Sequence, residues 1–159
     1  TEKHESTRHI SEVIGSKGKL KSIDIEKKSI DISKDICNNA ENVEWILSDS
    51  IEYLKNDEEK YHFVLLDSVN DPEHIFEEFK HIVKRLHVGG ILMIDDSGVE
   101  LDKKPFVNDW VHAPKKAVAV NKFLSDSEID YDIVVGGHPG NQLLFKATPE
   151  NMEKIEELL

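Results

Sequence analysis

The sequence has one cysteine, no long apolar run and a deficit of positive charge. Cys37 alone cannot form an internal disulfide, which fits a reducing compartment and predicts a cytoplasmic protein. No apolar run approaches the roughly 20 residues needed to span a bilayer. The 159 residues carry a formal net charge of −12, whereas surfaces that bind nucleic acids or anionic membranes are basic. We therefore expect neither a nucleic acid nor a membrane as a partner.

Two motifs of well-known enzyme classes are also absent. The chain has no nucleophile elbow around a serine and no phosphate-binding P-loop. Its position on an expected helix makes Cys37 a core residue rather than a nucleophile. Most of the eight histidines fall on helix surfaces or in loops, but His112 and His138 fall in the ligand-side loops or the hairpin turn, where either could be a base.

Segments with helical spacing alternate with short apolar strands along the whole chain. Helices are expected at 6–14, 26–39, 51–55, 72–88, about 117–124 and 148–159. Strands are expected at 20–25, 43–47, 63–66, 91–94, 131–135 and 142–147. This order predicts one α/β domain over residues 1–159, with a doubly wound, mostly parallel sheet and a C-terminal antiparallel hairpin strand.

The stretch Gly89–Gly98 (GGILMIDDSG) joins an apolar strand to two adjacent carboxylates. Residues 91–94 show no polar alternation, which is typical of a parallel strand buried on both faces. In doubly wound sheets, ligands bind beyond the carboxyl ends of the strands. Five acids fall there and form the main functional signal of the sequence: Asp24, Asp49, Asp67, Asp95 and Asp96.

The first two of these acids each have a functional and a structural interpretation. Asp24 ends the first expected strand, where a carboxylate can accept hydrogen bonds from a ribose diol or simply cap the next helix. Asp49 precedes the helix at Ile51, so capping is its favoured role on local evidence, with contact to an adenine amino group as the alternative.

The other three acids suggest a cation site. If their strands are neighbours, Asp67 and the Asp95-Asp96 pair lie roughly 5 Å apart across the sheet. Oxygen ligands favour Mg²⁺ or Ca²⁺ over zinc. Strand alternation, however, would point Asp95 and Asp96 to opposite faces, so that one of them would not reach the site.

With these residues placed, the chain resembles class I S-adenosylmethionine-dependent methyltransferases, in particular the small O-methyltransferases related to catechol O-methyltransferase. The resemblance rests on STRHISEVIGSKGKLKSIDIE, ILSDS, FVLLDS, LMIDDS and the last strand NQLLFKA. It implies a Rossmann-like fold and S-adenosylmethionine as cofactor, with Asp24 at its ribose and Asp49 and Ser50 at its adenine. It further implies cofactor contacts from Ser6, Thr7 and Asp67.

The resemblance also bears on the reacting centre. Metal-dependent relatives carry an Asp and an Asp-Asn pair at the positions of Asp67, Asp95 and Asp96, which implies Mg²⁺ or another divalent cation there. Asn70 stands where those relatives place a lysine base, and it cannot take a proton. Lys103 or Lys104 could reach in instead, or a metal could lower the pKa of a hydroxyl group.

The amino end departs from the family pattern. The family's first strand and glycine-rich loop precede the first helix, whereas this chain starts inside that loop, with Glu2 and His4 in place of glycines. Glycine lets the backbone approach the cofactor closely. We expect the natural protein to be longer at its amino end.

These features predict an enzyme that transfers a methyl group to an oxygen of a small-molecule acceptor, with Asp67 and Asn70 at the catalytic centre. A non-catalytic methyltransferase-like binding domain is the alternative that Glu2, His4 and Asn70 favour. A nicotinamide-dependent dehydrogenase rests on Asp24 alone. The oligomeric state, including a homo-oligomer, is left open.

Overall fold

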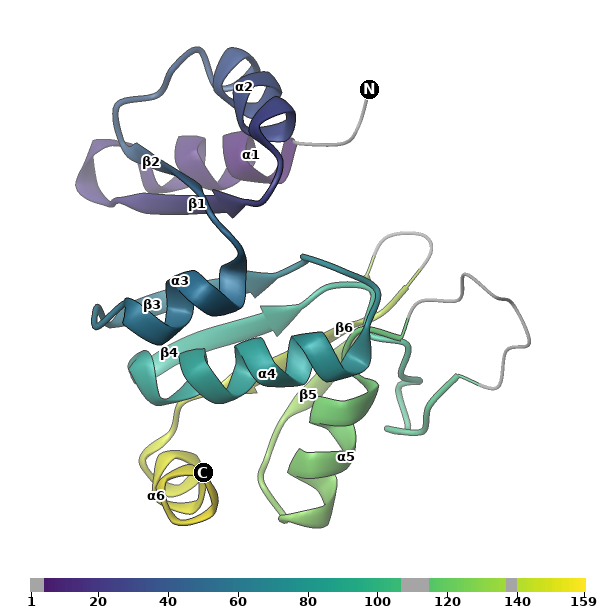
Figure 1. Cartoon of the computed structure of the whole chain (residues 1–159). Coiled ribbons are helices and arrows are strands. Elements are labelled where there is room, and N and C mark those ends of the chain that lie inside the picture. Colours follow the sequence, from purple (N-terminus) through teal and green to yellow (C-terminus); the bar gives the residue numbers. More distant parts are fainter. Residues whose placement is uncertain (1–4, 107–114, 137–139) are drawn as a thin grey trace. The chain divides into compact units, whose positions relative to one another are not determined.

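The computed structural model describes residues 5–106, 115–136 and 140–159 (Figure 1). The chain divides into two compact units, an amino-terminal unit (Thr1–Tyr53) and a carboxyl-terminal unit (Leu54–Leu159), and each is described by itself. Helices and strands alternate through both, so the predicted α/β class is confirmed. In the part of the chain that is described, no helix is both long and apolar enough to cross a membrane.

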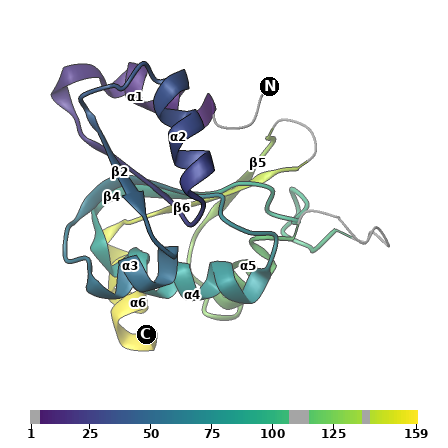
Figure 2. The same cartoon turned by 45° about the horizontal axis from the view of Figure 1, so that its top comes forward.

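The amino-terminal unit contains a two-stranded parallel sheet with two helices beside it (Figures 1 and 2). Asn42, just before the second strand, ties it to the first helix, because its side chain accepts a hydrogen bond from Ser11 Oγ at 2.8 Å and donates to the Gly15 carbonyl at 2.9 Å. The elements are α1 (Glu5–Ile14), a 3₁₀ turn (Gly15–Lys17), β1 (Leu20–Asp24), α2 (Lys27–Ile36), β2 (Val43–Leu47) and α3 (Ser50–Asn56), which runs on into the second unit.

The carboxyl-terminal unit contains a four-stranded sheet in the order β3-β4-β6-β5. β3 and β4 are parallel, whereas β6 is antiparallel to both of its neighbours, so three of the four strands run in one direction. The predicted antiparallel strand at the carboxyl end is confirmed. The elements are β3 (Tyr61–Leu66), α4 (Pro72–Ile82), a 3₁₀ turn (Val83–Arg85), β4 (Leu86–Ile94), α5 (Val118–Asp126), β5 (Asp132–Val134), β6 (Gln142–Lys146) and α6 (Pro149–Leu158).

An aromatic cluster joins the helices of this unit to its sheet. Phe79 on α4 meets Phe145 on β6 edge to face, with ring centroids 6.2 Å apart, and meets Phe123 on α5 at 6.0 Å. Phe79 and Phe145 are fully buried, and each such side chain contributes roughly 1.5–3 kcal/mol. α4 and α5 accordingly lie side by side (Figures 1 and 2).

Two predictions about the strands are wrong. Gly89 and Gly90 do not end the preceding helix; they lie within β4, where Gly89 N donates to the Ala147 carbonyl at 2.8 Å. A Cβ at Gly90 would approach the His87 carbonyl oxygen to 2.8 Å, which explains the glycine. Phe63 on β3 is 41% exposed rather than buried.

The opening strand is also less uniformly buried than its composition predicts. Leu92 and Ile94 are fully buried, while Ile91 and Met93 on the other face are half-buried. One face of β4 therefore packs in the core, and Asp95 and Asp96 follow directly after its carboxyl end.

Candidate functional site

Three carboxylates converge at the carboxyl ends of β3 and β4. The strands are parallel neighbours with Leu66 opposite Ile94, and Asp95 N donates to the Leu66 carbonyl at 3.1 Å. An oxygen from each of Asp67, Asp95 and Asp96 lies within 4.8 Å of the others. The predicted adjacency of the two strand ends is therefore confirmed.

The backbone at Asp96 explains why both members of the Asp95-Asp96 pair join this cluster. β4 ends at Ile94, and Asp96 has a φ of +45°, in the left-handed region. Alternation of side chains holds only while the strand is extended, and aspartate tolerates left-handed backbone better than most residues. The turn at Asp96 thus brings two consecutive carboxylates to the same place.

A lysine that the sequence interpretation missed lies in the cluster. The Lys116 ammonium donates a hydrogen bond to Asp67 Oδ1, and its Nζ lies 3.6 Å from Asp96 Oδ2. Only 10% of the Lys116 side chain is exposed. The three carboxylates are hard oxygen ligands that suit Mg²⁺ or Ca²⁺, but two of them already face this ammonium.

The three acids differ in their surroundings. Asp95 Oδ1 accepts a hydrogen bond from Gln142 Nε2 at 3.0 Å, and the Asp67 side chain is 44% exposed. Burial raises the pKa of Asp96 above its ordinary value, Lys116 opposes this shift, and the negative charges of Asp95 and Asp67 add to it. A positive charge beside Asp96 therefore offsets the cost of burying its carboxylate.

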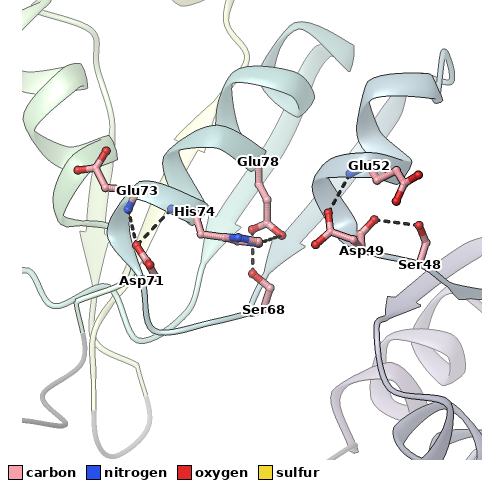
Figure 3. A network of polar contacts seen from close by, with 8 residues as sticks. All are labelled: Ser48, Asp49, Glu52, Ser68, Asp71, Glu73, His74 and Glu78. Carbon is pink, nitrogen blue, oxygen red and sulfur yellow. Dashed lines mark hydrogen bonds and ion pairs between the residues drawn. The ribbon is translucent and has the colours of Figure 1, made fainter.

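The loop between β3 and α4 is braced at several points (Figure 3). Ser68 Oγ donates to Glu78 Oε2 at 2.9 Å, and the fully buried Glu78 also lies 3.4 Å from His74 Nε2. Asp71 accepts from the backbone N–H groups of Glu73 and His74, which caps α4 as predicted. These contacts fix the loop that carries Asp67 and Asn70.

Asn70 contacts the segment that carries the lysine. Its Oδ1 accepts a hydrogen bond from the backbone N–H of Lys115 at 3.0 Å, one residue before Lys116. Lys116 N donates to the Asp96 carbonyl at 3.2 Å, and Ala117 N donates to the Ser97 carbonyl at 2.9 Å. The backbone at 115–117 is thus held against the ends of both strands.

In the amino-terminal unit, the predicted cofactor residues make local contacts. Asp24 ends β1 and its Oδ1 accepts from Glu26 N at 2.7 Å; Asp49 Oδ1 accepts from Glu52 N at 2.9 Å at the start of α3 (Figure 3). Ser50 is the first residue of α3. Ser6 is exposed within the first turn of α1, which starts at Glu5, and Thr7 Oγ1 lies 3.4 Å from Ser22 Oγ of β1.

The two lysines suggested as substitutes for the missing base are engaged elsewhere. Lys103 Nζ donates to the Tyr131 carbonyl at 2.7 Å, and Lys104 Nζ donates to Asp102 Oδ2 at 2.5 Å. In this structure neither lysine pairs with an acid of the cluster. A sequence signal for Lys116 does exist: two lysines precede a helix, where positive charge is unfavourable to the helix dipole.

Four residues singled out in the sequence lie outside the described residues. They are Glu2, His4, His112 and His138. Their predicted roles stay predictions.

Comparison with known proteins identifies the fold to which the structure is similar. No protein-family model and no curated protein matches the chain. Among solved structures, the O-methyltransferase TomG from Streptomyces achromogenes, in complex with SAM, is 17% identical, with 90% of this chain and 68% of that chain covered and a TM-score of 0.65. SAH-bound methyltransferase PaMTH1 from Podospora anserina is 18% identical (84% and 62% covered, TM-score 0.59).

An rRNA methylase from Streptococcus thermophilus has the same architecture, with 16% identity, 82% of this chain and 74% of that chain covered, and a TM-score of 0.57. Because an rRNA methylase shares this fold, the fold does not test the prediction that the chain has no nucleic-acid partner. At these identities the likeness concerns the fold. The chain has the Rossmann-like α/β fold of S-adenosylmethionine-dependent methyltransferases, as the sequence resemblance predicts.

Proposed function

We propose that the protein is an S-adenosylmethionine-dependent methyltransferase that methylates an oxygen of a small-molecule acceptor. The observation that carries the proposal is the convergence of Asp67, Asp95, Asp96 and Lys116 at the carboxyl ends of β3 and β4. Ligands of open α/β sheets bind beyond those strand ends. Fold neighbours that are methyltransferases support the same function.

When bound, S-adenosylmethionine supplies a methyl group activated on a sulfonium. Asp24 would accept hydrogen bonds from the ribose hydroxyls through Oδ2, which makes no hydrogen bond within the described residues, while Oδ1 holds Glu26 N. The sequence resemblance implies that Asp49 and Ser50 contact the adenine, and that Ser6, Thr7 and Asp67 contact the rest of the cofactor. Asp67 and Lys116 would orient the acceptor oxygen, so that the protein acts by proximity and charge.

Two features favour a small acceptor over a nucleic acid. The chain's net charge of −12 opposes a phosphate backbone, and the acceptor end of the proposed site is itself acidic. A divalent cation could assist by binding Asp67, Asp95 and Asp96 and lowering the pKa of the acceptor hydroxyl. It would first have to displace Lys116 from these carboxylates.

Transfer of a tritiated methyl group from S-adenosylmethionine tests the proposal. The protein is incubated with pools of phenols and aliphatic alcohols, and separately with rRNA. We expect label in a small hydroxyl compound, and about a hundredfold slower transfer by Asp67→Asn, since positioning errors at a reacting centre cost about that much. Asp126→Asn, an exposed acid on α5, is the matched control and should transfer at the wild-type rate.

Other outcomes of this experiment would overturn parts of the proposal. Label in rRNA alone would show that the acceptor class is wrong. Absence of transfer to every pool, together with absence of cofactor binding, would favour a non-catalytic binding domain.

A further inference from the structure

Lys116 is unusual among the lysines that the structure describes because it is buried beside acids. Its side chain is 10% exposed, whereas the side chains of the other lysines that pair with acids are between 35% and 78% exposed: Lys27, Lys80, Lys104, Lys122 and Lys154. Removing an ammonium from water costs several kcal/mol unless carboxylates compensate. Asp67 and Asp96 are the acids within 4 Å of it in the part of the chain that is described.

The stability of α5 does not explain this lysine. Lys116 lies two residues before Val118, the first residue of α5, and positive charge at a helix amino terminus is unfavourable by roughly 0.3–1 kcal/mol. The backbone nevertheless holds it there, through Lys115 N to Asn70 Oδ1, Lys116 N to the Asp96 carbonyl and Ala117 N to the Ser97 carbonyl. Three hydrogen bonds thus direct one ammonium at the carboxylates.

We propose that Lys116 is the resident counter-cation of the Asp67, Asp95 and Asp96 cluster, and that it competes with divalent cations for it. One ammonium suffices because Asp67 is partly solvated and Asp95 is hydrogen-bonded to Gln142, which leaves Asp96 as the half-buried acid to be neutralised. A divalent ion bound by the same oxygens would lie close to Nζ, and the two positive charges would repel. The ion therefore binds only if Lys116 withdraws.

The competition concerns cation binding alone and holds whatever reaction the protein performs. Its consequence for catalysis rests on the proposed function: methyl transfer would then proceed without added metal and in the presence of a chelator. In that case Lys116 supplies the positive charge that a metal would otherwise bring to the acceptor oxygen.

Thermal unfolding with and without MgCl₂ or CaCl₂, together with calorimetric titration of the two ions, tests the proposal. The wild type should show the same Tm in chelator and in either ion, and no saturable binding. Lys116→Met should gain at least about tenfold in affinity for one of the ions and show a rise in Tm with it. Lys115→Met, an exposed neighbour, should behave as the wild type.

A double variant locates the ion. Adding Asp96→Asn to Lys116→Met should remove the gained binding. Saturable ion binding by the wild type that Asp96→Asn abolishes would overturn the proposal, and this arm needs no Lys116 variant to fold. Equal ion affinity of the wild type and a folded Lys116→Met would overturn it as well. None of these results depends on cofactor binding.

Discussion

The two units place acids at strand ends in the same way and use them differently. In the amino-terminal unit, Asp24 ends β1 and Asp49 follows β2, and each accepts a hydrogen bond from a backbone N–H two or three residues ahead. In the carboxyl-terminal unit, Asp67, Asp95 and Asp96 converge around one buried lysine. Position at a strand end therefore does not decide the role of an acid.

The difference arises from the backbone beyond each strand. A helix follows β1 and β2 within a few residues, and its exposed N–H groups attract the nearest carboxylate. After β4 the chain makes a left-handed turn at Asp96 and begins α5 only at Val118, so no helix directly follows these acids in the sequence. They are instead compensated by Lys116, which arrives from 20 residues further along the chain.

The largest expected effect on stability is that of Lys116→Met. It leaves the half-buried Asp96 without a counter-charge, so we expect a loss of about 2 kcal/mol in the free energy of unfolding, below the full cost of breaking a buried pair because Asp67 is partly solvated. Lys27→Met, which breaks the exposed pair with Asp31, should cost less than about 0.5 kcal/mol. Urea unfolding without divalent ions measures both losses in free energy. Equal losses would contradict the difference between the buried lysine of the carboxyl-terminal unit and an exposed ion pair of the amino-terminal unit.

A smaller effect is expected at the cap of α3. Asp49→Ala should destabilise the protein by about 1 kcal/mol, whereas Asp49→Asn should cost only a few tenths, because asparagine caps a helix equally well. The same urea experiment decides this. A large loss in Asp49→Asn would show that the negative charge itself stabilises the fold, contrary to the capping role.

The next effect concerns the hydrogen bond that joins Asn70 to the backbone just before Lys116. Asn70→Ala removes one exposed hydrogen bond to Lys115 N and should cost about 0.5 kcal/mol. If the bond positions Lys116, the variant should also bind Mg²⁺ or Ca²⁺ more tightly than the wild type, although less tightly than Lys116→Met. Calorimetry distinguishes this from a local loss of stability alone, which would leave ion affinity unchanged.

The smallest effect is on how the free energy of unfolding changes with pH. The folded-state pKa of Asp96 is raised, chiefly by burial, so the folded protein holds this proton more firmly than the unfolded chain. Stability should then fall as pH rises from about the ordinary value of 3.8 through the raised pKa, and level off above it. Over this pH range, the wild type should lose free energy of unfolding relative to Asp96→Asn. A gain relative to the variant would contradict the raised pKa of Asp96.

Local chemistry accounts for what the sequence predicts well. Asp71-Pro72 and Thr148-Pro149 each combine a cap with proline at the first helical position, and both start helices where expected. The adjacency of Asp67 and Asp95 follows from strand order in α/β folds. Asp49 caps its helix, which was its favoured role.

Long-range contacts account for what the sequence does not predict. Nothing local requires the left-handed backbone at Asp96, and nothing near Asp67 indicates that Lys116 rather than Lys103 or Lys104 would meet it. The glycines at 89–90 have the local pattern of a helix end, but backbone pairing with the segment after β6 places them in a strand. Three expectations stay predictions: that the chain is a single domain, that all five strand-end acids share one edge of a sheet, and that the protein is cytoplasmic.

The measurement that tests the central claim most directly is calorimetric titration of S-adenosylhomocysteine into the protein, with Asp24→Asn and Asp31→Asn as a matched pair. The asparagine that replaces Asp24 can still accept the Glu26 N–H, so the first variant removes the charge while keeping this hydrogen bond. We predict a Kd of about 1 μM for the wild type and for the exposed Asp31→Asn, and at least about tenfold weaker binding by Asp24→Asn. Absence of binding by the wild type, or equal affinity of all three, would contradict the assignment of this fold to methyl transfer with Asp24 at the ribose.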